Sequence, residues 1–155
     1  MSILISTKGR YATRVMIELT ELYGTGNTSV RDISERTKLS PKYLESIIAV
    51  LTRNGLVKSA RGVQGGYSLV RDPSEYTIGE IVRAVEGEIA TVNCKRDSSE
   101  PCPKADTCST ARLWCRIDTA IFDILDNTTL KDLHEWNRTG DVLHIDNTCC
   151  PHEPL

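Results

Sequence analysis

The chain has 155 residues, of which 39% are hydrophobic, and a formal net charge of −2. This length suits one compact core with an appendage and is short for two independent domains, so we expect one globular unit that a second subunit completes. The first thirty residues carry charges throughout and contain no long apolar run. That pattern argues against a signal peptide or a membrane span and favours a cytoplasmic protein.

The charge is divided unevenly along the chain. Residues 1–71 contain 11 Lys and Arg against 5 Asp and Glu, whereas residues 72–155 contain 8 against 16. The basic half is therefore where a polyanion such as nucleic acid would dock.

Apolar periodicity, capping residues and glycines predict the secondary structure in chain order. Ser40 followed by Pro41 is typical of a helix cap and its first helical residue. The glycine-rich stretch 61–66 indicates the turn of a β-hairpin. Thr77 with Glu80 three residues later is typical of a capping box. The predicted helices cover 12–22, 29–37, 40–54, 77–87, 109–127 and a last one from about 129, and the predicted strands cover 56–60 and 67–70.

Two short helices joined by a turn and followed at once by a glycine-rich hairpin form the pattern of a winged helix. The fold class is therefore predicted as mainly α (α+β), a winged helix-turn-helix DNA-binding domain with a long dimerisation helix. The apolar stripe of that helix is too large to stay uncovered, and a two-fold partner helix is the simplest cover, so we expect a homodimer. The stripe consists of Leu113, Ile117, Ala120, Ile121 and Ile124.

Candidate DNA contacts lie on the second helix of the helix-turn-helix and on the wing. The N-terminus of the helix that begins at Ser40 suits phosphate binding, and Glu45 and Ser46 could touch base edges. Arg61 opens the wing, where an arginine can enter a narrow minor groove. A charged helix face is often only solvated, and the wing glycines do not form a phosphate loop because no Gly-Lys-Ser/Thr follows them. The predicted DNA-binding residues are Ser40, Lys42, Tyr43, Glu45, Ser46, Arg53, Arg61 and Gly62.

Three cysteines, Cys94, Cys102 and Cys108, lie in a polar segment between the winged domain and the long helix. Packing alone does not order such a segment, whereas thiolate coordination of a metal centre would. Seven and five residues separate the cysteines, which is looser than the short knuckles of structural zinc and suits a bulkier cluster. The alternative is that they are simple loop cysteines. The residues near the C-terminus that could ligate a metal but receive no role are Cys149, Cys150 and His152.

These features predict four parts of the chain: a winged helix-turn-helix domain (1–90), a cysteine-containing sensor loop (91–108), a dimerisation helix with a C-terminal helix (109–137) and a polar tail (138–155). No enzyme is expected, because the three histidines lie late in the chain without a nucleophile partner. Neither Gly-x-Ser-x-Gly nor His-Glu-x-x-His occurs.

Five short sequence motifs occur in order along the chain. They are Ser-Thr-Lys-Gly-Arg-Tyr-Ala (6–12), Ile-Ser-Glu-Arg (33–36), Tyr-Leu-Glu (43–45), Asn-Gly-Leu-Val (54–57) and Arg-Gly-Val-Gln-Gly-Gly-Tyr (61–67). Together with the three-cysteine loop, they resemble the IscR, NsrR and CymR family of bacterial winged-helix transcription regulators. The resemblance covers about residues 1–135.

The resemblance implies a homodimeric regulator that senses iron-sulfur, redox or nitric oxide status through a cluster on the three cysteines, with 2Fe-2S favoured over 4Fe-4S. The implied partners are a two-fold site in double-stranded DNA and cluster-assembly proteins, with no membrane. Two departures leave the fourth ligand open. IscR-type members have a histidine where Ala111 lies, and NsrR-type members use a carboxylate of the other subunit where Arg10 lies. Cys115 is the nearest substitute, although its helical setting is more typical of a packed residue.

Two alternatives remain beside the cluster hypothesis. CymR-type members lack the cysteines and sense through partner proteins or other routes. The same fold could therefore carry a cluster-free thiol, disulfide or persulfide switch, or respond to a metabolite or a partner protein. A metal-storage or cluster-carrier protein that does not bind DNA is the other hypothesis.

Overall fold

The computed structural model describes residues 5–62, 65–92, 102, 104 and 107–140 of the chain. Every predicted helix and both predicted strands are present, so the mainly α fold class with a small hairpin is confirmed. The short 3-10 helix η1 was not predicted. The elements are α1 (Thr7–Thr20), α2 (Val30–Thr37), α3 (Pro41–Arg53), β1 (Val57–Ala60), β2 (Gly66–Leu69), η1 (Pro73–Glu75), α4 (Ile78–Glu86), α5 (Ala111–Asn127) and α6 (Leu130–Thr139).

Capping residues fix where the helices begin, largely as the sequence predicts. The Ser40 hydroxyl caps α3, and Pro41 is its first residue. At the start of α4 the expected capping box is only half formed. The Thr77 hydroxyl accepts a hydrogen bond from the Glu80 N–H at 3.1 Å. The Glu80 carboxylate turns away and accepts instead from the Arg71 guanidinium at 2.7 Å, because an ion pair satisfies it better than a neutral N–H.

One core lies among α1, α3 and α4, and the apolar stripes of these helices point into it. Leu130, at the start of α6, belongs to the same core, so the C-terminal helix packs onto the winged unit. The fully buried side chains with the largest volume are Tyr76, Met16, Leu19, Ile33, Leu44, Ile47, Ile48, Leu51, Leu56, Leu69, Ile81 and Leu130.

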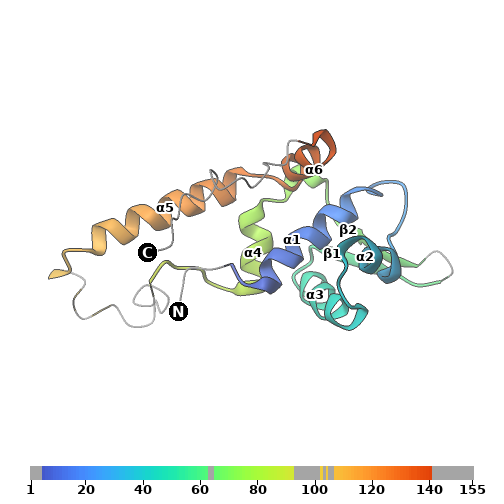
Figure 1. Ribbon diagram of the computed structural model, residues 1–155, viewed down its shortest axis with the longest axis horizontal. Helices are drawn as coiled ribbons and strands as arrows, with labels where there is room; N and C mark the ends of the chain where they lie inside the picture. Colours follow the sequence, from blue (N-terminus) through green and yellow to red (C-terminus); the bar gives the residue numbers. More distant parts are fainter. Residues whose placement is uncertain (1–4, 63–64, 93–101, 103, 105–106, 141–155) are drawn as a thin grey trace.

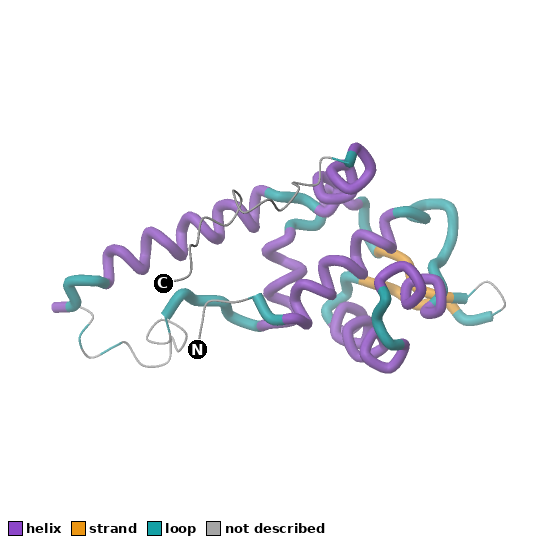
Figure 2. Tube along the Cα trace, viewed as in Figure 1, coloured by secondary structure: helices purple, strands orange, loops and turns teal. Residues whose placement is uncertain are grey.

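The wing is an antiparallel hairpin of β1 and β2 in which Ala60 lies opposite Gly66 (Figure 2). Thr28, which precedes α2, pairs with Tyr67 through two N–H to O bonds of 2.9 Å each. A Cβ at Gly66 would lie 2.5 Å from the Thr28 carbonyl oxygen, so this close approach requires glycine. The wing is therefore fixed to the chain that leads into the helix-turn-helix.

The long helix α5 extends away from the winged unit, and its N-terminal end lies farthest from it (Figure 1). Two backbone bonds hold its other end. The Ile78 N–H donates to the Thr128 carbonyl oxygen at 2.9 Å, and the Leu130 N–H donates to the Tyr76 carbonyl oxygen at 3.0 Å. Neither α5 nor any other helix in the described part of the chain is long and apolar enough to cross a membrane.

Candidate nucleic-acid interface and thiol site

The turn between α2 and α3 sets the direction of α3. Lys38 has a left-handed backbone with a φ of 59°, and its N–H donates to the Ser34 carbonyl oxygen at 2.9 Å. The Ser34 hydroxyl in turn donates to the Leu39 carbonyl oxygen at 2.6 Å. A side chain in this conformation costs on the order of 1 kcal/mol. The hydrogen bonds, rather than the preference of lysine, therefore hold the turn.

The outward face of α3 carries most of the predicted DNA-binding residues. Ser40, Lys42, Glu45, Ser46 and Arg53 are all exposed. The Ser40 hydroxyl accepts from the N–H of residue 43 at 3.4 Å. Further N–H groups in the first turn of a helix have no intrahelical partner, and they favour an anion at this end of α3.

Tyr43 is a predicted DNA contact that also has a packing role. It is half-buried, and its ring meets the Tyr11 ring edge-on, with centroids 6.0 Å apart and planes at 82°. The Arg14 guanidinium lies 5.9 Å from the centre of the Tyr11 ring. Tyr11 of α1 thus packs against Tyr43 of α3.

The wing presents Arg61 and Gly62 to solvent. Gly62 has a φ of 109°, and its carbonyl oxygen accepts from the Gly65 N–H at 2.9 Å, which closes the turn on one side. Arg61 makes no ion pair with any residue that the structure describes. Its guanidinium is therefore available to an external anion.

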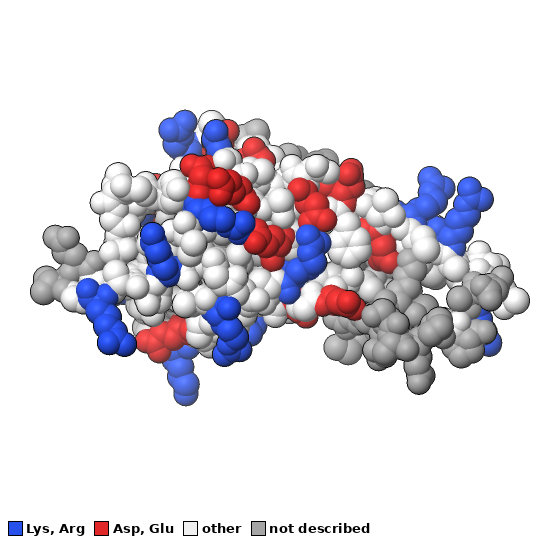
Figure 3. Space-filling view, turned by 180° about the vertical axis from the view of Figure 1, so that it is seen from behind, with Lys and Arg blue, Asp and Glu red and all other residues white. Residues whose placement is uncertain are grey.

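The helix α3 and the wing adjoin each other. Glu45 and Arg53 of α3 and Ser59 and Tyr67 of the hairpin line one open groove of about 410 Å³. On the face drawn in Figure 3, Lys and Arg side chains are spread over the end that carries the helix-turn-helix and gather again at the opposite end, whereas Asp and Glu predominate towards the middle.

The N-terminus of α1 is held by a carboxylate that is distant in sequence. Glu86, the last residue of α4, accepts hydrogen bonds from the Ser6 N–H at 3.0 Å, the Ser6 hydroxyl at 2.5 Å and the Gly9 N–H at 3.1 Å. A Cβ at Gly9 would clash with this carboxylate and with Ile5. A negative charge at a helix N-terminus is also favoured by the helix dipole. Glu86 therefore joins α1 to the end of α4, just before the cysteine segment.

Two of the three predicted cluster cysteines lie within the described residues, and Cys94 lies outside them. Cys102 is half-buried, Cys108 is exposed, and both thiols are free. The Thr110 hydroxyl lies 3.4 Å from the Cys108 sulfur. A hydrogen bond with this hydroxyl is the main reason why the pKa of the Cys108 thiol lies below its ordinary value. Backbone groups at the start of α5 and the charge of Lys104 lower the pKa further. Cys108 is thus predisposed to be a thiolate.

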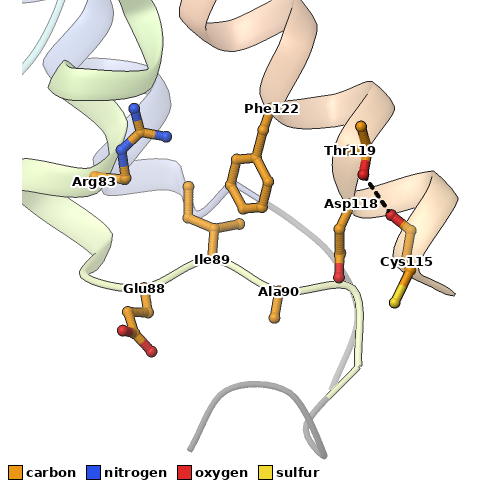
Figure 4. Close-up of a pocket in the computed structure, with 8 residues that line it drawn as sticks. All are labelled: Arg83, Glu88, Ile89, Ala90, Cys115, Asp118, Thr119 and Phe122. Carbon is orange, nitrogen blue, oxygen red and sulfur yellow. Dashed lines mark hydrogen bonds between the residues drawn. The ribbon is translucent and has the colours of Figure 1, made fainter. Parts of the chain in front are cut away.

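Cys115 is not packed against the rest of the chain, so the packing prediction for it is wrong. Its side chain is exposed. It lines an open cavity of about 520 Å³ between α5 and the segment that follows α4 (Figure 4). Arg83 of α4 and Ile89 of the following segment line that cavity from the other side, and Phe122 lines it from α5. The predicted terminal set of Cys149, Cys150 and His152 lies outside the described residues.

The segment entering the cysteine loop runs beside α5. The Thr91 N–H donates to the Asp118 carboxylate at 2.8 Å, and Figure 4 shows Asp118 next to Ala90. Thr91 lies three residues before Cys94. Among the described residues, no group of three or more His, Cys, Asp or Glu side chains is placed to hold a metal ion.

A family model described as "Rrf2: Iron-dependent Transcriptional regulator" matches residues 5–135. The chain belongs to the Rrf2 family. This Rrf2 regulator is 44% identical over 132 residues to the HTH-type transcriptional regulator CymR of Bacillus subtilis, covering 85% of the chain and 90% of the relative. It is 36% identical over 138 residues to the HTH-type transcriptional regulator IscR of Klebsiella pneumoniae, covering 89% and 83%.

Solved structures of the same two kinds of regulator resemble this Rrf2 regulator. CymR of B. subtilis, described as its global cysteine regulator, has a TM-score of 0.72 at 41% identity, covering 84% of this chain and 95% of that chain. IscR of T. potens has a TM-score of 0.72 at 37% identity, covering 90% and 91%. The resemblance to the IscR, NsrR and CymR family is confirmed, and these relatives are named as transcriptional regulators rather than enzymes.

Sequence reasoning missed two side chains that organise this Rrf2 regulator, Tyr76 and Glu86. Tyr76 lies in a polar stretch between the wing and α4, where no periodicity marks it as buried, yet it is 0% exposed. The sequence around Glu86 suggests only a solvated side chain at the end of a helix. The only available signal was the glycine in the first turn of α1, since a glycine inside a helix often marks a close approach of another group.

Proposed function

We propose that this Rrf2 regulator binds a two-fold site in double-stranded DNA as a homodimer, with α3 in the major groove and the wing against the adjacent minor groove. The observation that carries the proposal is the exposed polar face of α3, which lines one groove with the wing hairpin, while Arg61 of the wing is exposed and has no ion pair among the described residues. Ser40, Lys42 and Tyr43 would contact phosphates, and Glu45 could accept from a cytosine amino group. The other proposed contacts are Ser46, Arg53, Arg61 and Gly62.

The dimer interface is proposed to be the outer face of α5. No residue of α5 is buried in the chain. Leu113 is 52% exposed and Ile124 is 66% exposed, and both belong to the predicted apolar stripe. Residues 118 and 122, which face the segment after α4, lie on the other side of the helix. A second copy of α5 would cover the stripe, because an isologous contact pairs one patch with itself.

The cysteine loop is proposed to hold an iron-sulfur cluster on Cys94, Cys102 and Cys108. The donor chemistry of the described residues fits such a group, since Cys102 and Cys108 are free and the pKa of Cys108 is lowered. When bound, a cluster supplies a centre that reacts with oxidants and nitric oxide. A 2Fe-2S cluster is favoured over 4Fe-4S, and cluster-assembly proteins would deliver it.

Cys115 is proposed as the fourth protein ligand. Ala111 has no donor atom, and Arg10 is a cation whose guanidinium donates to Thr7 at 3.2 Å. Cys115 lies four residues after Ala111, and residues four apart lie on the same face of a helix. Its thiol is exposed and free, and it faces the segment that leads to Cys94.

A cluster at this position would act on DNA binding through α5. The loop begins beside Asp118, which holds Thr91, and ends at the first turn of α5. A cluster bound to the loop cysteines would therefore constrain how the winged unit sits relative to α5, and hence relative to its copy across the dimer. Two recognition helices must reach half-sites about one DNA turn apart, ~34 Å, so a change of pose alters affinity.

A cluster-free thiol switch is the second candidate function. The 44% identity to CymR favours a switch without a cluster, and the exposed Cys108 thiol with its lowered pKa favours a thiol as the sensor. In this case Cys108 would form a disulfide with another cysteine, and an external oxidant would accept the two electrons. Iron analysis and mass-spectrometric mapping of disulfides distinguish the two candidates.

DNA binding is tested with sites selected by the protein from a pool of random duplexes. Fluorescence anisotropy across a salt series should give a steep loss of affinity with salt, and Lys42→Ala or Arg61→Ala should lower the salt slope by about 1. Lys131→Ala on α6 is the matched control, because it removes an exposed positive charge far from α3. Selection of no two-fold site, or equal slopes in all variants, would contradict the proposal.

The cluster is tested by iron and sulfide content and visible absorption after anaerobic purification. Cys102→Ala and Cys108→Ala should lose most of the iron. Cys115→Ala should lose it or shift the absorption bands, whereas replacing both Cys149 and Cys150 by alanine should change neither. Protein that carries no iron after reconstitution would exclude the cluster and leave the thiol switch.

A further inference from the structure

Tyr76 inserts its hydroxyl between the two strands of the wing at their root. The hydroxyl donates to the Leu56 carbonyl oxygen at 2.9 Å. It accepts from the Val70 N–H and from the Arg71 N–H, each also at 2.9 Å. Leu56 directly precedes β1, and Val70 directly follows β2. The direct backbone bond between Val70 and Leu56 is long, at 3.4 Å, so the phenol oxygen supplies the link where the strand pairing ends.

The backbone of Tyr76 contacts a second part of the molecule, near the end of α5. Its carbonyl oxygen accepts from the Leu130 N–H at 3.0 Å, and Thr77, the next residue, pairs with Thr129. Residues 128–130 are the junction between α5 and α6. One buried residue thus contacts both the wing root and the end of the helix that we assign to dimerisation.

The surroundings of Tyr76 keep it in place. The Arg71 guanidinium lies 4.4 Å from the centre of its ring and pairs with Glu80 of α4 at 2.7 Å. The ring itself is fully buried. The wing root, α4 and the α5–α6 junction therefore meet at one residue with few ways to rearrange.

We propose that Tyr76 is a positioning residue for DNA binding, whose hydroxyl sets the angle of the wing and ties that angle to α5. This inference rests on the proposed DNA contact of the wing. The four residues of β1 span ~13 Å at about 3.3 Å each, so a 10° tilt at the root moves the wing tip by ~2 Å. That displacement is enough to break a contact between Arg61 and the DNA.

The test is a double-mutant cycle between the wing root and the wing tip. Tyr76→Phe removes the hydroxyl and keeps the ring. We expect Arg61→Ala to weaken binding to the selected duplex about tenfold in the unaltered protein, and by less than about threefold in the Tyr76→Phe background, because the misplaced wing no longer contacts DNA. Tyr23→Phe, which removes a tyrosine hydroxyl beside Asp72 that is not among the three hydrogen bonds of the Tyr76 hydroxyl, is the matched control and should leave the effect of Arg61→Ala unchanged.

A purely structural role for the hydroxyl predicts a different outcome. Tyr76→Phe would then lower the melting temperature, while the two substitutions would act additively on affinity, and additivity overturns the inference. If Arg61→Ala alone has no effect, the proposed wing contact itself fails, and the inference fails with it. Amide exchange in Tyr76→Phe gives a second readout. Val70 and Arg71 should exchange faster while the pair Thr28 and Tyr67 stays protected, and unchanged exchange at Val70 and Arg71 would also overturn the inference.

Discussion

Replacing Ile124 by alanine should weaken the dimer without harming the single chain. Ile124 is 66% exposed in the chain, so about two-thirds of its apolar surface remains for a partner to cover. Ile→Ala removes about three carbon groups, worth ~2.4 kcal/mol if fully buried, and two-thirds of that is ~1.6 kcal/mol per copy. A two-fold dimer contains two copies, so the loss is about 3 kcal/mol, or roughly 200-fold in the dimer Kd.

Sedimentation velocity over a concentration series measures this Kd. Arg112→Ala is the matched control, because Arg112 is exposed on the same helix but lies off the apolar stripe. The control should stay within about threefold of the unaltered protein. Far-ultraviolet circular dichroism at high concentration checks that the helices remain. If Ile124→Ala changes the Kd no more than Arg112→Ala does, the stripe of α5 is not the interface and the dimer must form elsewhere.

Three further predictions concern single side chains. Glu86→Ala should destabilise the chain by about 1–3 kcal/mol in urea denaturation, because donors at the start of α1 lose their acceptor, whereas Glu88→Ala, at an exposed neighbour, should have little effect. In metal-free protein, the rate of alkylation of Cys108 should reach its plateau at a lower pH than that of a free thiol, whose pKa is about 8.5. Thr110→Ala should move the midpoint of this pH dependence upward. An unchanged midpoint would show that Thr110 does not stabilise the thiolate. The pKa of Asp132 is held below its ordinary value by the hydroxyl and N–H of the threonine that caps α6, so the stabilisation is present at neutral pH and is lost as pH falls through that lowered pKa. Asp132→Asn should therefore lower the melting temperature at pH 7 but not near pH 2, and equal losses at both pH values would refute the cause.

Local sequence signals were sufficient to predict most of the fold. Ser40 with Pro41 begins α3 as expected, and the box of Thr129 and Asp132 at α6 is fully formed. These signals work because the cap and its partner lie within one helical turn, where backbone geometry fixes their distance. The apolar stripes were equally readable, since helical spacing alone places them on one face.

Features that depend on tertiary contacts could not be predicted from the local sequence. The Glu80 carboxylate does not complete its own capping box but accepts from Arg71, nine residues earlier in the chain. Glu86 accepts from Ser6, which is 80 residues away in the sequence. Periodicity also placed Cys115 on a helix without telling which face that helix would turn to the rest of the chain. Its side chain lies on the side of α5 that faces the segment after α4, where an open cavity leaves it exposed.

The most direct test of the account compares the DNA affinity of one anaerobic preparation before and after its iron is removed. Fluorescence anisotropy with the selected two-fold duplex measures both states at the same salt concentration. Removing iron should change the affinity by at least about tenfold, on the scale of a coupling free energy of 1–3 kcal/mol. A variant with both Cys102 and Cys108 replaced by alanine should bind DNA like the iron-free protein. Equal affinities with and without iron, in protein shown to contain it, would contradict the claim that the cysteine loop controls DNA binding.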